Sequence, residues 1–496
     1  MKRITAFILT VCLFAAVTCG CGGNDAQSGF SEPAESINNT LAEQYGDDPN
    51  ADYEVKGNVS VGVNMARYSD FELLIDSFKE LYPNIELDVI TFETGTDDAT
   101  EYLTSLSMAE KKLPDILYDD AGSIPTYISN SWAYPLNEFL TDEDTDYSHI
   151  PENIINNLSY NGRLYALPQT LHFNGVVVNT DLVDELNIDV PEFNWNWNDF
   201  SDFLKKTTTS KYSGIEIIGT AINWMSGSMS DGLTVSGYNP QTRLFELSDS
   251  VLKAINYVKE IRSLHSVEAW SLRGAGGTQS DYAKKFSTLS NITDSYAAFN
   301  GGLVASRFAG TWSYGEINSN NLEFNWEYFP VPQETEGRLP MHVDYCWMTT
   351  GVTDENKAAA WEFLRFITYS REGNLIRLSA YDEENYDEDS VNQTFYIPCT
   401  TEPSVLEKFE SLPMVTEAIL YMYDNIGNSY FGDPEKTVPG FDFVYDFVLD
   451  EADKAINGQT DFTAKMGEIQ SKANNQITQY WSDFEANLKD FEDQLG

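Results

Sequence analysis

The chain has few cysteines, few basic residues and no long apolar run beyond its first twenty residues. Its 496 residues include 5 Cys and 4 His, and 30 Lys and Arg stand against 78 Asp and Glu, for a formal net charge of −48. A field of that sign repels nucleic acids and anionic ligands, so we expect neither as a partner. No His or Cys has metal-ligand spacing, and we expect no metal and no other cofactor. Past the N-terminal region only Cys346 and Cys399 remain, either as a disulfide or as two buried thiols.

Residues 1–20 have the organisation of a secretory signal peptide. A basic start precedes an apolar stretch, residues 4–17, that is too short to cross a bilayer. Small residues surround Cys21, which resembles the position at which bacterial lipoproteins are cleaved and acylated; Cys19 is the alternative. We therefore expect an exported chain that is held at the outer face of the cell membrane by a lipid on Cys21.

Residues 21–55 are polar and acidic, with few large apolar side chains. Such a stretch buries too little surface to offset its ordering entropy, so we expect a flexible tether. The alternative is that residues 37–45 form a docked helix. The remainder of the chain is too long for one hydrophobic core, which indicates two or three domains.

The body of the chain begins with alternating strand and helix patterns. Residues 59–64, 85–92 and 113–118 have the pattern of strands, and residues 71–82 and 100–112 that of helices. This order predicts a parallel α/β sheet, in which ligands bind beyond the carboxyl ends of the strands. Side chains of the loops at those ends are binding candidates: Asn64, Arg67, Tyr118, Asp119 and Asp120. The two Asp residues have a second interpretation, as N-caps of a helix near Ser123.

Signatures of enzymes are weak. The acidic residues 142–146 lack the Gly and the final Glu that a calcium loop requires. Glycoside hydrolysis needs only two carboxylates, so a secreted glycoside hydrolase or another polysaccharide-active surface protein stays as the alternative function. A surface scaffold is disfavoured because nothing in the chain repeats.

Seven short segments, in a fixed order, carry a resemblance that covers nearly all of the exported body. They are residues 78–85 (FKELYPNI), 114–116 with 132–136 (PDI, WAYPL), 162–168 with 179–182 (GRLYALP, NTDL), 197–200 (WNDF), 299–302 with 310–312 (FNGG, GTW), 329–332 (FPVP) and 358–364 (AAAWEFL). In this order they resemble the extracellular solute-binding proteins of carbohydrate ABC transporters, the maltose-binding-protein-like class. Each segment alone is weak, and the specificity lies in their order.

The resemblance implies a two-lobe α/β fold with a ligand cleft between the lobes. The boundaries that it implies are residues 56–170 plus 341–398 for lobe one and 171–335 plus 400–496 for lobe two. The crossings between lobes would be residues 166–169 and 332–340, in agreement with Pro168, which is an unusual residue for a central strand. It further implies a monomer that hands a carbohydrate to the membrane permease of an ABC importer and performs no catalysis.

A sugar site needs flat aromatic rings for the C–H faces and directional polar groups for the hydroxyls. Under the implied fold, further candidates are His172 and Asn174 near the first crossing, Trp224 and Trp312 on lobe two, and Asp344, Tyr345 and Trp347 after the second crossing. Core packing is the alternative for the two Trp residues, and an ordinary hinge role is the alternative for His172 and Asn174. Four further Trp residues are expected only to pack: Trp132, Trp195, Trp197 and Trp361.

Overall fold

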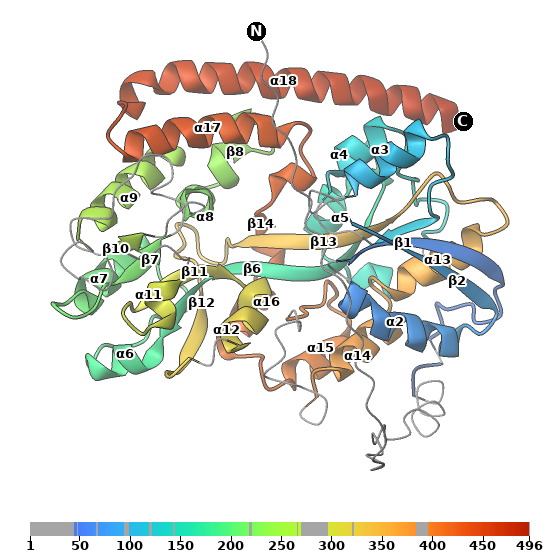
Figure 1. The fold of residues 1–496 in the computed structure, drawn as a ribbon, viewed down its shortest axis with the longest axis horizontal. Helices are drawn as coiled ribbons and strands as arrows, with labels where there is room; N and C mark the ends of the chain where they lie inside the picture. The colour runs from blue at the N-terminus through green and yellow to red at the C-terminus, as the bar shows by residue number, and fades with distance from the viewer. Residues whose placement is uncertain are drawn as a thin grey trace, which may run out of the picture.

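Strands and helices alternate along the chain from Gly57 onward (Figure 1). The computed structural model describes residues 44–46, 48–65, 68–93, 99–118, 122–141, 144–217, 221–264, 266–268, 296–319, 322–382 and 395–495. Up to the first long strand the elements are β1 (Gly57–Asn64), α2 (Tyr68–Leu81), β2 (Ile85–Phe92), α3 (Thr100–Met108), β3 (Ile116–Tyr118), α4 (Ile124–Ser129), α5 (Glu152–Asn157), β4 (Ser159–Tyr160) and β5 (Arg163–Leu164).

The first long strand, β6 (Leu167–Asn179), opens the second part of the chain. After it come α6 (Thr180–Glu185), α7 (Trp197–Thr207), β7 (Ile215–Ile217), α8 (Ala221–Ser228), β8 (Tyr238–Asn239), β9 (Leu244–Phe245), α9 (Val251–Leu264), β10 (Ser266–Glu268), α11 (Ala297–Asn300), β11 (Ser306–Gly310), α12 (Tyr314–Ser319) and β12 (Trp326–Pro330). The chain then continues through β13 (Pro340–Met348), α13 (Lys357–Phe366), α14 (Arg371–Ser379), α15 (Pro403–Glu410), α16 (Glu417–Asp424), β14 (Tyr430–Phe431), α17 (Phe441–Ile456) and α18 (Phe462–Leu495).

The predicted strand and helix order of the first part is confirmed, but the third strand is shorter than residues 113–118 and the second helix is shorter than residues 100–112. β1 and β2 pair in parallel over their full length, and β1 also pairs in parallel with β3. Helix α3 ends at Met108 rather than at Lys112. It ends because the chain turns into the left-handed region at Glu110, where φ is 52°, and an L-residue in that conformation cannot continue a right-handed helix.

A single sheet runs through the molecule in the order β10-β7-β11-β6-β13-β3-β1-β2. The paired strands β6 and β13 occupy its centre, and helices lie on both sides of it (Figure 1). One end of the sheet consists of β1, β2 and β3, and the other of β7, β10, β11 and β12. The result is a two-lobe α/β fold, as expected, in which the expected crossings lead directly into the two central strands.

Pro168 contradicts the reasoning from its residue type, because it lies inside the central strand β6. It pairs with Tyr345 where the register shifts between Asp344 and Tyr345. At such an irregularity a ladder hydrogen bond is already missing, so the absent N–H of a proline costs little there.

The C-terminal part of the expected tether is packed on the body instead of being flexible. Asp48 is buried, and its Oδ2 lies 2.8 Å from Nη2 of Arg365 on α13. The Tyr53 hydroxyl donates to Oε2 of Glu372 on α14 at 2.8 Å. The tether prediction for residues 44–55 is therefore wrong over the part described, because these polar contacts are joined by apolar packing: Tyr45 is buried in the core and Tyr53 packs against it.

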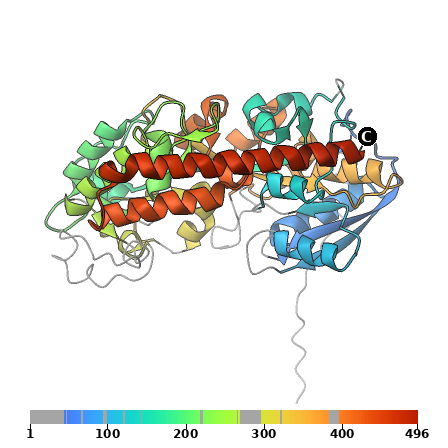
Figure 2. The ribbon, with the colours of Figure 1, turned by 90° about the horizontal axis from the view of Figure 1, so that it is seen from above.

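Helix α18 is 34 residues long and packs against α17 and β9 as well as against α4. Seen from above, it runs along the length of the molecule over both halves (Figure 2). Near its beginning, side chains of Gln470 and Asn474 accept from the backbone of Leu247 and Phe245. Near its end, Glu492 contacts Arg163 and Asn161. One helix thus contacts elements from both halves of the molecule.

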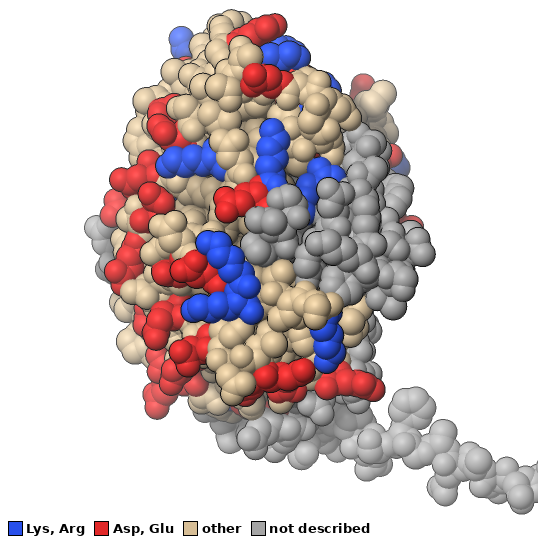
Figure 3. Space-filling view, turned by 90° about the vertical axis from the view of Figure 1, so that its left-hand side faces the viewer, with Lys and Arg blue, Asp and Glu red and all other residues tan. Residues whose placement is uncertain are grey.

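The surface carries charges of both signs, and the two cysteines of the body lie inside it. On the face shown in Figure 3, Lys and Arg side chains are interspersed among Asp and Glu, so no continuous basic patch covers that face. Cys346 and Cys399 are buried thiols and form no disulfide. Within the described ranges, no helix is long and apolar enough to span a bilayer.

Candidate binding site at the centre of the sheet

The strand directions bring the carboxyl ends of both halves of the sheet together at its centre. β6 runs antiparallel to β13, and β13 runs antiparallel to β3, so β1, β3 and β6 point the same way. β11 is antiparallel to β6 and parallel to β7. The ends of β1 and β3 therefore face the ends of β7 and β11 across the middle of β6 and β13, where an α/β sheet places ligands.

Two histidines and an aspartate share one face of the central strands. His172 on β6 pairs directly with His342 on β13, and Thr170 pairs with Asp344. Because side chains of alternate residues project to the same face, all four lie on one side of the sheet. His172 Nε2 lies 3.4 Å from Asp344 Oδ2, and His172 Nδ1 lies 3.3 Å from Thr311 Oγ1. Both ring nitrogens of His172 thus have partners that fix the ring.

A turn between β14 and α17 adds a lysine and a second aspartate to this face. Lys436 Nζ lies 2.9 Å from Asp344 Oδ1 and 3.0 Å from Asp433 Oδ2. His342 Nδ1 lies 3.6 Å from the same Asp433 oxygen. We call His172, His342, Asp344, Asp433 and Lys436 the central polar cluster. Its members join three segments that are far apart in the sequence, which keeps each group oriented.

The electrostatics of the cluster favour an ionised Asp433. Burial opposes its ionisation, but Lys436 and His342 outweigh burial and hold the pKa of Asp433 below its ordinary value. Burial, reinforced by the charge of Asp433, raises the pKa of the neighbouring Glu435 well above its ordinary value. The cluster therefore holds an ionised Asp433 beside Lys436, and such charge-assisted groups hydrogen-bond strongly to a polar ligand.

The indole of Trp312 lies beside the cluster and is 39% exposed. Its ring centroid is 4.9 Å from that of His342 and 5.8 Å from that of His172, both in edge-to-face geometry. The ring sits on Gly310, where an added Cβ would come within 2.3 Å of the indole carbons. Only glycine allows this approach, so the backbone itself holds a flat aromatic surface next to the polar groups.

Asn174 lies two residues beyond His172, on the same face of β6, and pairs with Gly310 in the sheet. It is fully buried, and neither its amide oxygen nor its amide nitrogen has a hydrogen-bond partner among the described residues. A buried amide without a partner is costly. A ligand that offered a donor and an acceptor there would remove that cost.

Other predicted site residues lie elsewhere. Trp347 is 1% exposed and stacks on Tyr127 at 4.3 Å, and Tyr345 is buried with its hydroxyl donating to the Gly122 carbonyl. Both are core residues and correct the prediction, because their side chains alternate with that of Asp344 along β13 and face the other side of the sheet. Tyr118 is also buried and accepts a hydrogen bond from Gln169.

Several predicted residues are only partly described or not described. Asn64 is buried at the end of β1. Trp224 lies in α8, but its side chain is outside the described part. Arg67, Asp119 and Asp120 lie outside the described residues.

Three members of the central polar cluster were missed: His342, Asp433 and Lys436. The spacing of His342 two residues before Asp344 on one strand was a usable signal, because both then share a face. No sequence pattern around Asp433 and Lys436 indicates that this turn packs beside the central strands. Within the described ranges, no group of His, Cys, Asp and Glu could hold a metal ion.

Comparison with known proteins agrees with this geometry. Residues 74–382, more than half of the chain, match the family model of bacterial extracellular solute-binding proteins. The fold is similar to an ABC substrate-binding protein from Listeria monocytogenes in complex with cycloalternan, at a TM-score of 0.61 and 16% identity, over 86% of this chain and 100% of that one. It is also similar to a sugar transporter from Rhizobium etli in an open conformation, at a TM-score of 0.63 and 15% identity, over 84% of this chain and 99% of that one.

A third similar structure is the maltose/maltodextrin-binding domain MalE from Bdellovibrio bacteriovorus bound to maltotriose, at a TM-score of 0.57 and 14% identity, over 85% of this chain and 100% of that one. At these identities the structural matches establish the fold, and the family match extends from within α2 through both central strands to the end of α14. The chain belongs to the family of bacterial extracellular solute-binding proteins.

Proposed function

We propose that this protein is the extracytoplasmic substrate-binding component of an ABC importer and binds a carbohydrate, an oligosaccharide, between its two lobes. The observation that carries the proposal is the Trp312 indole, which is exposed beside the central polar cluster where the strand ends of both halves meet. An indole face suits the C–H face of a pyranose ring, and the surrounding Asp, His and Lys groups suit its hydroxyls. The similar proteins bound to cycloalternan and maltotriose support this ligand class.

The proposed role is binding without catalysis. Both carboxylates of the cluster are already paired with Lys436, whereas glycoside hydrolysis needs one carboxyl group held protonated as the acid and a second one as base or nucleophile. We expect maltotriose or a longer oligosaccharide to be recovered intact after prolonged incubation. Shorter sugars in molar excess over the protein, detected by chromatography, would favour the hydrolase instead.

The direct test is a thermal-shift screen of the purified body against maltose, maltotriose, longer maltooligosaccharides and cyclic glucans. A ligand that binds only the folded state raises the melting temperature. We expect at least one oligosaccharide to do so for the wild type and to lose its effect in Trp312→Ala. No shift with any of them, confirmed by calorimetric titration, contradicts the proposed ligand class.

We further propose that the lobes consist of residues 56–170 plus 341–398 and of residues 171–335 plus 400–496. The protein acts as a monomer that delivers its cargo to a membrane permease. Residues 1–20 are a signal peptide, and Cys21 carries the lipid that anchors the protein to the membrane. The N-terminal pattern supports the anchor, and membership of an extracellular family supports export. Mass spectrometry of membrane-extracted protein should find an acylated N-terminal Cys21. A mature form without lipid excludes the anchor.

A further inference from the structure

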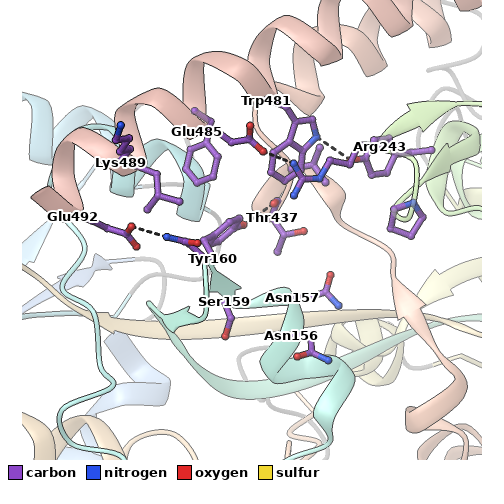
Figure 4. Close-up of a pocket in the computed structure, with 16 residues that line it drawn as sticks. Asn156, Asn157, Ser159, Tyr160, Arg243, Thr437, Trp481, Glu485, Lys489 and Glu492 are labelled. Atoms are coloured by element: carbon purple, nitrogen blue, oxygen red, sulfur yellow. Dashed lines mark hydrogen bonds and ion pairs between the residues drawn. The ribbon is translucent and has the colours of Figure 1, made fainter.

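A second cavity lies beneath α18, away from the central polar cluster. Its volume is about 520 Å³, within the range of small-molecule sites. Figure 4 shows side chains of α18 reaching down toward Tyr160 and the end of α5. Its walls come from α5 and the β4–β5 turn on one side, and from the β8–β9 turn on the other. These walls belong to different proposed lobes, so a molecule in the cavity would touch both.

The floor of the cavity is aromatic and fixed by hydrogen bonds. Tyr160 is buried, and its hydroxyl donates to the Thr437 carbonyl at 2.6 Å. Its ring meets Phe484 of α18 edge to face at 5.1 Å. Tyr238 is buried as well, and its hydroxyl accepts from Trp481 Nε1 at 3.1 Å. Rings that are held in this way offer flat apolar surfaces at low entropic cost.

The rim of the cavity is polar and balanced in charge. Arg243 lies 3.8 Å from the centre of the Trp481 ring, and its Nη1 is 2.6 Å from Oε1 of Glu485. Glu492 lies 3.4 Å from Nε of Arg163 and accepts from Nδ2 of Asn161 at 2.7 Å. Among the charged residues of the lining, two acids face two bases, the second base being Lys489. The chain as a whole has a net charge of −48, so equal numbers of acidic and basic residues set this lining apart from the rest of the protein.

We propose that this cavity is a second binding site, which takes a small neutral polyhydroxylated molecule such as a monosaccharide, a disaccharide or a polyol. Balanced charges give a charged ligand no net attraction, whereas oriented Arg, Glu and Asn groups satisfy hydroxyls that both donate and accept. The buried rings match the apolar faces of such a molecule. Because the occupant contacts both lobes, it stabilises the relative lobe position seen here and changes the affinity of the central site by population shift.

Fluorine NMR of protein that carries 5-fluorotryptophan tests the site directly. The resonances of Trp481 and Trp312 are assigned by their loss in Trp481→Phe and Trp312→Phe. The probes are glycerol, methyl α-glucopyranoside and maltose, with glucose 6-phosphate as a charged analogue. We expect at least one neutral probe to shift the Trp481 resonance saturably, in the wild type and equally in Trp312→Ala, and the charged analogue to have no such effect.

A matched pair of variants on α18 separates the cavity from the rest of the helix. Lys489→Met removes a polar group of the rim and should weaken the effect on Trp481 about fivefold, the value of one hydrogen bond. Lys465→Met lies on the same helix outside the cavity and should leave the effect unchanged.

Three results overturn the proposal. The first is a Trp481 resonance that no probe moves, which makes the cavity a water-filled groove only. The second is a shift that disappears in Trp312→Ala, since it then originates in the central site. The third is binding of the charged analogue alone. If no sugar binds at the central polar cluster, the Trp312 resonance does not move. The two proposals are therefore tested by different resonances.

Discussion

Two indoles of this protein have opposite surroundings. Trp312 is exposed beside the central polar cluster, whereas Trp361 is 9% exposed and stacks on Phe139 at 5.0 Å. If Trp312 stacks on a sugar ring, Trp312→Ala should lower the affinity by about 2 kcal/mol or more, as loss of a buried aromatic anchor does. Calorimetric titration measures the affinity, and thermal melts measure the stability of the same samples.

Trp361→Ala is the control for that prediction. It should lower the free energy of unfolding by about 3–5 kcal/mol, as expected for a core Trp, and leave the affinity of the folded fraction nearly unchanged. Normal binding together with early melting of Trp312→Ala would assign Trp312 to the core and leave Trp224 as the stacking candidate.

Glu372 should make stability depend on pH. Burial, reinforced by Asp48, raises its pKa to about 7, against the opposing effects of the Tyr82 hydrogen bond and Arg365. The folded state therefore binds a proton that the unfolded state has released above about pH 4.5. This contribution, at most about 3 kcal/mol, is fully present below that pH and is lost as pH rises through about 7.

Glu372→Gln removes this titration and can keep both hydrogen bonds, to Tyr82 and Tyr53. Urea unfolding at pH 5 and at pH 8 should show a smaller loss of stability with rising pH for the variant than for the wild type. Glu407→Gln, an exposed carboxylate on α15, serves as the control and should follow the wild type. Identical profiles for all three proteins would refute the assignment.

At the residue scale, the sequence indicates which residue types suit a sugar site better than it indicates which of them are buried. The packing predicted for Trp132, Trp195, Trp197 and Trp361 is confirmed, because all four are buried. Asp344 and His172 come together, whereas Trp347, three positions after Asp344 on β13, is internal. The difference follows from the alternation of side chains along β13, which puts Trp347 on the opposite face from Asp344.

At the scale of elements, the N-terminal segment is held to α13 by the buried ion pair between Asp48 and Arg365. Asp48→Asn would leave Arg365 buried without its main counter-ion, at a cost of about 3–5 kcal/mol. We expect the lower end of that range, because Asp146 also lies 3.7 Å from Arg365. Chemical denaturation of the variant measures the loss.

The double variant Asp48→Asn with Arg365→Met tests the cause. Removing the stranded charge should restore part of the lost stability, because no buried Arg then lacks its main counter-ion. If the double variant is no more stable than Asp48→Asn, the uncompensated charge is not the source of the cost.

Elements with a strong periodic pattern were predictable, and those defined by distant partners were not. α7 begins at Trp197 because Asn196 and Asp199 form a capping box within four residues, a purely local signal. The docked segment around Asp48 depends on Arg365, more than 300 residues away, and on a pair of buried charges that polar composition alone would place in solvent.

For the whole molecule, the prediction concerns closure. The two proposed lobes are joined by β6 and β13 and bridged by α18, and a ligand at the centre gains contacts to the second lobe only when the lobes rotate toward each other. Small-angle scattering should therefore give a smaller radius of gyration at saturating oligosaccharide. An unchanged radius would indicate a lobe arrangement that is already closed, or a site confined to one lobe.

Helix α18 has a thermodynamic consequence. Lobes connected only by two strands could melt one after the other, but one rigid helix packed on α17, β9 and α4 makes the loss of either lobe expose surface on the other. Calorimetry should therefore show one cooperative transition, with equal calorimetric and van't Hoff enthalpies. Removal of residues 481–495 should divide it into two. A single transition in the truncated chain would mean that the central strands alone enforce cooperativity.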